Sequence, residues 1–143
     1  MKKTLLVLLT IIMIAGLTAC SFSKEKEKSV FEKMLESPVA LMESSDGRKI
    51  YVWSRLDLAS LASMRIEKHP LEPTDKEDDW LYRITYNPKE KVINGEEIVV
   101  SFHSDYLQIG PDYYLPEEGV DYGNILGWAE MKFEYFMKTY EAE

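Results

Sequence analysis

The chain has 143 residues, with 17 Lys or Arg, 25 Asp or Glu and a single cysteine. This length suits one domain with its own core rather than two, and a single cysteine excludes an internal disulfide. The formal net charge of −8 makes nucleic acid a poor partner, because nucleic-acid binding depends on clustered Lys and Arg.

The first 20 residues have the pattern of a secretory signal. Lys2 and Lys3 precede an apolar run over residues 5–14, and small residues then lead to Cys20. The uncharged segment over residues 4–19 is 16 residues long, which is short of the roughly 17 residues that a membrane-spanning helix needs. The pattern therefore predicts a segment that directs export and is removed.

The tetrad Leu17-Thr18-Ala19-Cys20 resembles the lipobox of bacterial lipoproteins. The resemblance implies that residues 1–19 are removed and that the sulfur of Cys20 carries a diacylglycerol, with palmitate-type chains. Two acyl chains would anchor the protein stably in the lipid of the cell membrane, on its extracytoplasmic face. The whole chain is also similar to small lipoproteins of Gram-positive bacteria. The alternatives are an uncleaved signal anchor and a free thiol on a secreted domain.

A charged tether is predicted to follow the anchor. Residues 20–28 comprise the lipidated cysteine and alternating Lys and Glu with almost no apolar content, so they have little to bury. A single domain is predicted over residues 29–143. Removal of the two signal lysines leaves 15 basic against 25 acidic residues, a net charge of about −10. Residues 96–143 hold 11 of the acids and only two lysines, which allows a basic protein or peptide as partner, although an acidic surface also simply keeps an exported protein soluble.

The domain is predicted to begin with a short helix and a hairpin. Ser29 followed by Glu32 is a capping-box pattern, and Pro38 stops the helix. The pair Asp46-Gly47 is a signal for a tight turn. Two apolar, β-prone runs flank this pair, at residues 39–42 and 50–53.

A central helix and then four strands are predicted next. Apolar residues at helical spacing predict a helix over residues 55–67, which His69-Pro70 closes. Asn94-Gly95 is a second hairpin signal. Short β-prone runs separated by turn residues predict strands, the last three of them a meander, at residues 81–86, 98–103, 106–109 and 113–115.

The chain is predicted to end in an amphipathic helix that starts at about Gly123. Its apolar residues recur at spacings of three and four, and Glu134 and Lys138 form a favourable i,i+4 pair on the opposite side. The predicted apolar face consists of Leu126, Ala129, Phe133, Phe136 and Tyr140. We therefore expect an α+β fold of two layers, in which an antiparallel meander packs against this helix, with the central helix in addition.

Few residues suggest catalysis. Ser101, His103 and Asp105 are the residue types of an acyl-transfer triad, but alternate residues of a strand lie about 7 Å apart, too far for a proton relay. We expect His103 to be exposed near a hairpin tip and His69 to be a surface histidine. No phosphate loop, zinc motif or calcium-loop pattern is present, so neither a cofactor nor a metal site is predicted.

The candidate binding surface is acidic and rich in tyrosine. In a strand, Tyr113 and Tyr114 face opposite ways, so one of the two can be exposed. Tyrosine supplies contact area at low entropic cost and is enriched at binding hot spots. The predicted binding residues are Tyr106, Tyr113, Tyr114, Glu117, Glu118 and Asp121.

The leading hypothesis is a non-enzymatic, membrane-anchored lipoprotein that binds another protein or a peptide. Immunity or inhibition directed at a basic toxin or enzyme is one version of this role. One alternative is a small hydrolase or metal-dependent enzyme that uses His69 or His103 with acidic neighbours. Another is a structural envelope protein without a ligand.

Overall fold

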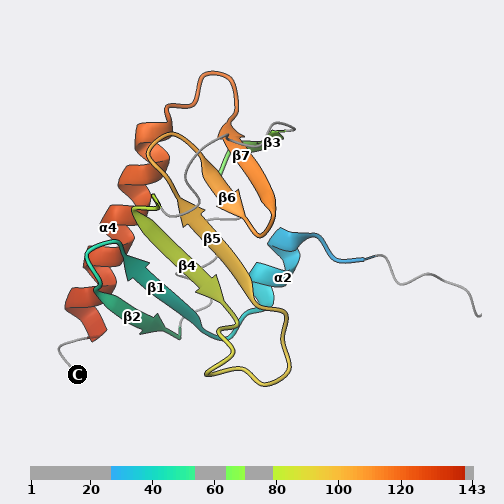
Figure 1. Cartoon of the computed structure of the whole chain (residues 1–143), viewed down its shortest axis with the longest axis vertical. Coiled ribbons are helices and arrows are strands. Elements are labelled where there is room, and N and C mark those ends of the chain that lie inside the picture. The colour runs from blue at the N-terminus through green and yellow to red at the C-terminus, as the bar shows by residue number, and fades with distance from the viewer. Residues whose placement is uncertain (1–26, 54–63, 70–78, 141–143) are drawn as a thin grey trace, which may run out of the picture.

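The computed structural model describes residues 27–53, 64–69 and 79–140, which form a mixed α+β fold (Figure 1). The predicted signal segment with Cys20 lies outside the described residues, as do residues 54–63 and 70–78. In chain order the elements are α2 (Val30–Glu36), β1 (Ala40–Ser44), β2 (Lys49–Val52), β3 (Ile66–His69), β4 (Tyr82–Tyr86), β5 (Ile98–Phe102), β6 (Leu107–Ile109), β7 (Asp112–Pro116) and α4 (Tyr122–Tyr140).

The strands form one seven-stranded antiparallel sheet in the order β2-β1-β4-β5-β6-β7-β3. The predicted hairpin around Asp46-Gly47 is confirmed, because β1 and β2 pair on either side of it, and Gly47 supplies the positive φ of 91° that the turn needs. The predicted meander is confirmed as β5, β6 and β7, which pair consecutively. β4 and β5 also pair, but residues 87–97 connect them as a long loop rather than a two-residue turn at Asn94-Gly95.

β3 corrects the end of the predicted central helix. Residues 66 and 67 belong to a strand that pairs with β7, with Ile66 opposite Pro116 and His69 opposite Tyr113. Pairing with a strand that lies far along the chain outweighs the local helical periodicity, since tertiary context overrides weak propensity. Residues 54–63 of the predicted helix lie outside the described residues.

Both described helices lie on one face of the sheet, which we call the helix face. Residues directly opposite each other on paired strands share a face. One such row consists of Ser44, Tyr82, Phe102, Leu107 and Tyr114. Phe133 of α4 contacts the Tyr82 ring, with ring centroids 5.7 Å apart. Trp128 of α4 contacts the Phe102 ring, with ring centroids 6.2 Å apart. Phe31 of α2 contacts the Tyr114 ring, so α2 covers the same face.

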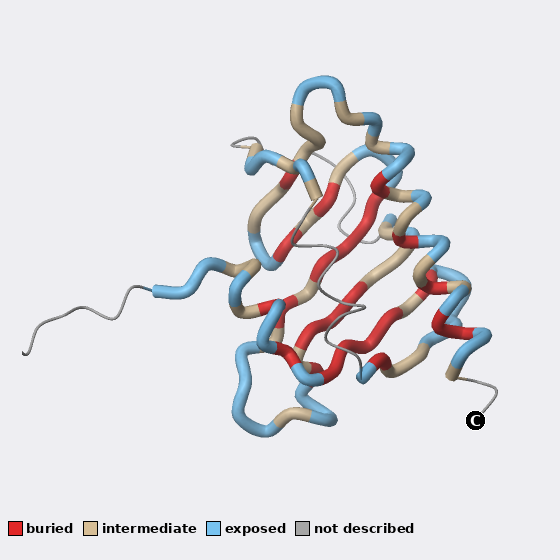
Figure 2. The backbone as a smooth tube through the Cα atoms, turned by 180° about the vertical axis from the view of Figure 1, so that it is seen from behind, coloured by how far each residue is buried: buried red, intermediate tan, exposed pale blue. Residues whose placement is uncertain are grey.

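The apolar residues of α4 and the central strands form the core (Figure 2). The buried residues of α4 are Ile125, Ala129, Phe133, Phe136 and Met137. The predicted apolar face is therefore rotated slightly, because Ile125 and Met137 take central positions while Leu126 and Tyr140 are only partly buried. All of these residues except Phe136 are spaced four apart along the chain. Residues at this spacing form the ridge by which helices commonly pack against their neighbours. Each fully buried large side chain contributes about 1.5 to 3 kcal/mol.

Arg48 connects the first hairpin to α4. Its Nε lies 2.8 Å from a carboxylate oxygen of Asp46, and its Nη1 lies 2.9 Å from a carboxylate oxygen of Glu134. The guanidinium also lies 5.1 Å from the centre of the Phe133 ring. Glu134, expected to pair with Lys138, thus forms an ion pair with the turn of the first hairpin. The contact aligns the turn with the helix, although exposed ion pairs of this kind contribute little stability.

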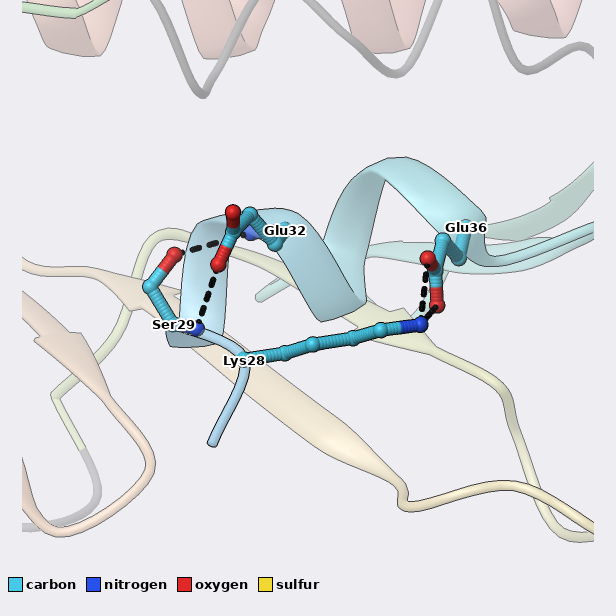
Figure 3. A network of polar contacts seen from close by, with 4 residues as sticks. All are labelled: Lys28, Ser29, Glu32 and Glu36. Atoms are coloured by element: carbon cyan, nitrogen blue, oxygen red, sulfur yellow. Dashed lines mark hydrogen bonds and ion pairs between the residues drawn. The ribbon is translucent and has the colours of Figure 1, made fainter. Parts of the chain in front are cut away.

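α2 begins with the capping box that the sequence predicts (Figure 3). The backbone N–H of Glu32 donates to Oγ of Ser29 at 3.2 Å, and the N–H of Ser29 donates to the Glu32 carboxylate at 2.7 Å. Lys28 pairs with Glu36 along the outside of the helix. The helix ends before Pro38, as expected, and its buried residue is Met34.

Replacement of Phe133 tests the position of α4. The ring is fully buried, so Phe133→Ala should lower the free energy of unfolding by about 3 to 5 kcal/mol through lost burial and the cavity that remains. Met131→Ala is the matched control on the same helix, because Met131 is 58% exposed and should cost less than about 0.5 kcal/mol. Urea unfolding followed by circular dichroism measures both. Equal costs would contradict this orientation of α4.

Candidate functional site

The second face of the sheet carries a row of polar side chains, and we call it the polar face. Strand pairing places one residue from each of five strands in this row, namely Glu43, Arg83, Ser101, Gln108 and Tyr113. Within the described part of the chain, both helices cover the opposite face. The residues of this row lie outside the hydrophobic core cluster, although Ser101 is buried.

Tyr106 and Tyr113 lie side by side on this face. Their ring centroids are 5.8 Å apart at an interplanar angle of 62°, an edge-to-face contact, and both residues are partly exposed. Tyr106 also stacks on His103, with centroids 4.2 Å apart and rings within 10° of parallel. We call Tyr106 and Tyr113, with His103 beneath Tyr106, the aromatic patch. The structure thus brings together two of the predicted binding residues.

Tyr114 does not belong to this surface. It is 8% exposed and its ring contacts Phe31 at 6.1 Å, so it is part of the core. Strand alternation predicts that Tyr113 and Tyr114 point to opposite faces, and the structure shows that Tyr114 is the buried one.

The turn between β5 and β6 holds the aromatic patch in place. The N–H of His103 donates to the carbonyl of Tyr106 at 2.9 Å, which closes the turn. The hydroxyl of Tyr122, the first residue of α4, lies 2.7 Å from the carbonyl oxygen of His103 and 2.6 Å from that of Tyr106. Burial raises the pKa of Tyr122, and the nearby Asp105 raises it further. One hydroxyl therefore connects α4 to both ends of the turn.

The expectation that His103 is exposed is wrong. The residue is 2% exposed, and its Nε2 has no hydrogen-bond partner among the described residues. Burial lowers the pKa of His103, while a hydrogen bond with the backbone of Asp79 acts in the opposite direction. Because the stacked Tyr106 ring covers the imidazole, a position near a hairpin tip does not expose it. The sequence contains no local signal for this contact.

Ser101, His103 and Asp105, the three residue types of an acyl-transfer triad, each contact a different neighbour. The hydroxyl of Ser101 accepts a hydrogen bond from Nε of Arg83 at 3.3 Å, and the guanidinium of Arg83 also lies 4.2 Å from the centre of the Trp80 ring. Asp105 is exposed at the turn and accepts from Ser104. The three side chains are thus engaged in separate contacts, as the strand spacing predicts. His69 lies on β3, opposite Tyr113, and is partly buried.

Carboxylates lie near the aromatic patch. Burial raises the pKa of Tyr106, and the neighbouring Tyr113, Asp105 and Asp79 add to this effect. Both aspartates are exposed. A cationic group that approached the patch would therefore meet two aromatic rings in a field of negative charge, the combination that favours cation–π contacts.

The other predicted acids lie in the loop between β7 and α4. Glu117 pairs with Arg65 at 2.8 Å, whereas Glu118 is exposed. Asp121 precedes α4 and caps its start, since its carboxylate accepts the N–H of Gly123 at 2.9 Å. Glu117 and Asp121 thus have structural contacts in addition to the binding role that we predict for them.

A concave region lies between α2 and the β4–β5 loop, apart from the aromatic patch. Its cavity measures about 360 Å³, and the ion pair between Lys33 and Glu96, 2.6 Å long, crosses its lining. Asn87 adopts a φ of 49°, and its side chain donates to the carbonyl of Glu96. A Cβ at Gly95 would come within 3.2 Å of the Asn87 side chain, so glycine permits this close approach. Asn94-Gly95, expected to form a hairpin turn, therefore helps to build this cavity.

Two features that would suggest other functions are missing from the described residues. Residues 27–53, 64–69 and 79–140 contain no group of three His, Cys, Asp or Glu side chains that could hold a metal ion. No helix in the same part of the chain is long and apolar enough to cross a membrane.

Comparison with protein-family models, with curated proteins and with solved structures gave no significant match for this chain.

Removal of the Tyr122 hydroxyl tests its role at the turn. Tyr122→Phe leaves two carbonyl groups without this donor and should lower the free energy of unfolding by about 1 to 3 kcal/mol. Tyr135→Phe is the control, because Tyr135 is 53% exposed and should change stability by less than about 0.5 kcal/mol. Chemical unfolding gives both values. If the two variants are equally stable, the hydroxyl does not hold the turn.

Proposed function

We propose that this protein is a non-enzymatic lipoprotein, anchored to the extracytoplasmic face of a cell membrane through an acylated Cys20, that binds a basic protein or peptide. The observation that carries the binding role is the contact between Tyr106 and Tyr113 on the polar face, beside exposed carboxylates. An immunity protein or an inhibitor directed at a basic toxin or enzyme is the version of this role that the charge favours.

The geometry of the patch supports binding to a cationic partner. Two tyrosine rings in edge-to-face contact present a rigid apolar surface at little entropic cost. The turn that carries Tyr106 is fixed to α4 through Tyr122, so the surface is formed before a partner arrives. Preorganisation of this kind reduces the free energy lost on binding.

The charge distribution supports the same partner class. Several cations of the domain already pair with carboxylates, in the pairs Lys33–Glu96, Arg48–Glu134, Arg65–Glu117 and Lys68–Asp112. These pairs use four of the eleven acids of residues 96–143, and the seven that are left still outnumber the two lysines of that segment. A negative surface accelerates association with basic proteins, and the effect weakens as salt increases.

The alternative of an enzyme that uses His103 has less support. His103 is buried and its ring interacts with the backbone of Asp79, whereas a general base needs an accessible nitrogen within reach of the substrate. The binding role uses residues that are accessible, namely Tyr106 and Tyr113.

The patch can be tested with a short synthetic peptide rich in Lys and Arg. Tyr113→Ala should raise the Kd for this peptide about tenfold, which corresponds to about 1.4 kcal/mol of lost contact. Tyr135→Ala, at an exposed tyrosine on α4, should leave the Kd unchanged. Fluorescence anisotropy at low and at high salt measures both effects. Equal losses in the two variants, or binding that does not respond to salt, would contradict the proposal.

The anchor can be tested at the cysteine. Cys20→Ala removes the sulfur that acylation requires, so the chain should remain an uncleaved or mislocalised precursor without lipid. Ser23→Ala, three residues further on, should be processed normally. Labelling with a palmitate analogue, followed by mass determination of the membrane fraction, distinguishes the two. Lipid on the Cys20→Ala protein would refute the lipobox assignment.

A further inference from the structure

His103 is a buried imidazole that peptide binding does not explain. It follows the last residue of β5 and is 2% exposed. The ring interacts with the backbone of Asp79, and Nε2 has no partner among the described residues, so Nδ1 is the atom that donates to the Asp79 carbonyl. In this arrangement the imidazole is neutral, and Nε2 carries a buried lone pair.

Protonation would place a charge in a site that opposes it. Burial is the strongest influence on His103 and disfavours the imidazolium, and Arg83 of β4 adds repulsion. Three groups act in the opposite direction: the backbone of Asp79, the carboxylate of Asp105 and the side chain of Gln108 on β6. The balance lowers the pKa of His103 below 6.5. Among the described residues, the other ionisable groups that contact the His103 ring or its backbone are the phenols of Tyr106 and Tyr122, which stay neutral in this range.

The ring and the turn are mechanically connected. His103 supplies both the imidazole that stacks on Tyr106 and the N–H that closes the turn onto the Tyr106 carbonyl. A proton on Nε2 needs an acceptor or water, and no described residue places an acceptor within hydrogen-bond distance of that nitrogen. The side chain of Gln108 favours the charged ring, but less than burial opposes it. The ring can reach water by leaving the stack, and Tyr106 then loses the surface that orients it against Tyr113.

We propose that protonation of His103 opens the β5–β6 turn and separates Tyr106 from Tyr113, so that mild acid takes the aromatic patch apart. The opening is a property of this chain alone, whereas its effect on a partner rests on the function proposed above. At neutral pH the patch is assembled and competent to bind. In acid the same surface loses one of its two rings.

The direction of the pH dependence follows from proton linkage. The opened turn exposes His103 and binds a proton with the ordinary pKa of about 6.5, while the closed turn binds it more weakly. The closed turn is therefore fully stable above about pH 6.5. Its stability decreases as the pH falls from 6.5 to the lowered pKa of the closed form, and then stays low.

Nuclear magnetic resonance of the full chain in a non-denaturing detergent tests the opening without any partner. The chain has two histidines, and His69→Gln assigns the remaining imidazole signal to His103. We expect this signal to titrate below pH 6.5. We also expect the protection of the His103 amide, corrected for intrinsic exchange, to fall at least about threefold between neutral pH and the end of that titration. Constant protection through the titration would overturn the proposal.

His103→Phe separates the charge from the stacking. Phenylalanine keeps a flat ring against Tyr106 but cannot be protonated, so protection of the residue 103 amide should no longer depend on pH. Unchanged pH dependence in this variant would overturn the proposal, and if the variant fails to fold, the wild-type titration still decides.

The Lys- and Arg-rich peptide separates the two proposals. Opening in acid together with weaker peptide binding in acid supports both. Opening in a protein that does not bind the peptide at any pH supports the opening of the turn on protonation of His103 and contradicts the binding role. Binding that is independent of pH, with a turn that stays closed, contradicts only the opening of the turn.

Discussion

The packing of α4 across one face of the sheet is the constraint on which the remaining structure depends. Phe133 contacts Tyr82 of β4, and Trp128 contacts Phe102 of β5, so the helix crosses the central strands. A sheet with one side packed against helices places most of its large apolar residues on that side, as β5 does with Ile98, Val100 and Phe102. Strand alternation then assigns every second residue to the opposite face, whatever its chemistry.

The packing of α4 also decides which residues lie on the polar face. Once Phe102 is buried under α4, its neighbours Ser101 and His103 point away from the helix. The same alternation places Tyr113 on the polar face and Tyr114 in the core. The aromatic patch is therefore fixed by the register of β5, β6 and β7, which the core residues determine.

Local patterns in the sequence predict the elements whose contacts are also local. The capping box of α2, the hairpin at Asp46-Gly47 and the apolar periodicity of α4 depend on residues close along the chain, and the structure confirms them. β3 was wrongly predicted as the end of a helix because its partner β7 lies more than 40 residues away. The burial of His103 was missed for a related reason, since the covering ring belongs to a turn whose conformation depends on Tyr122.

Three elements, β5, β6 and α4, meet at the β5–β6 turn and are connected there by a few hydrogen bonds. The base of the turn is held by the backbone hydrogen bond from His103 to Tyr106 and by the hydroxyl of Tyr122, the first residue of α4. Its apex at Ser104 and Asp105 is exposed. The orientation of Tyr106 depends on these contacts and on a single stacked ring, whereas Tyr113 is held within β7 between two paired strands. Because the two halves of the patch are fixed so differently, a change at the turn can move Tyr106 without moving Tyr113. A surface built in this way can change its shape while the core, and therefore the fold, stays intact.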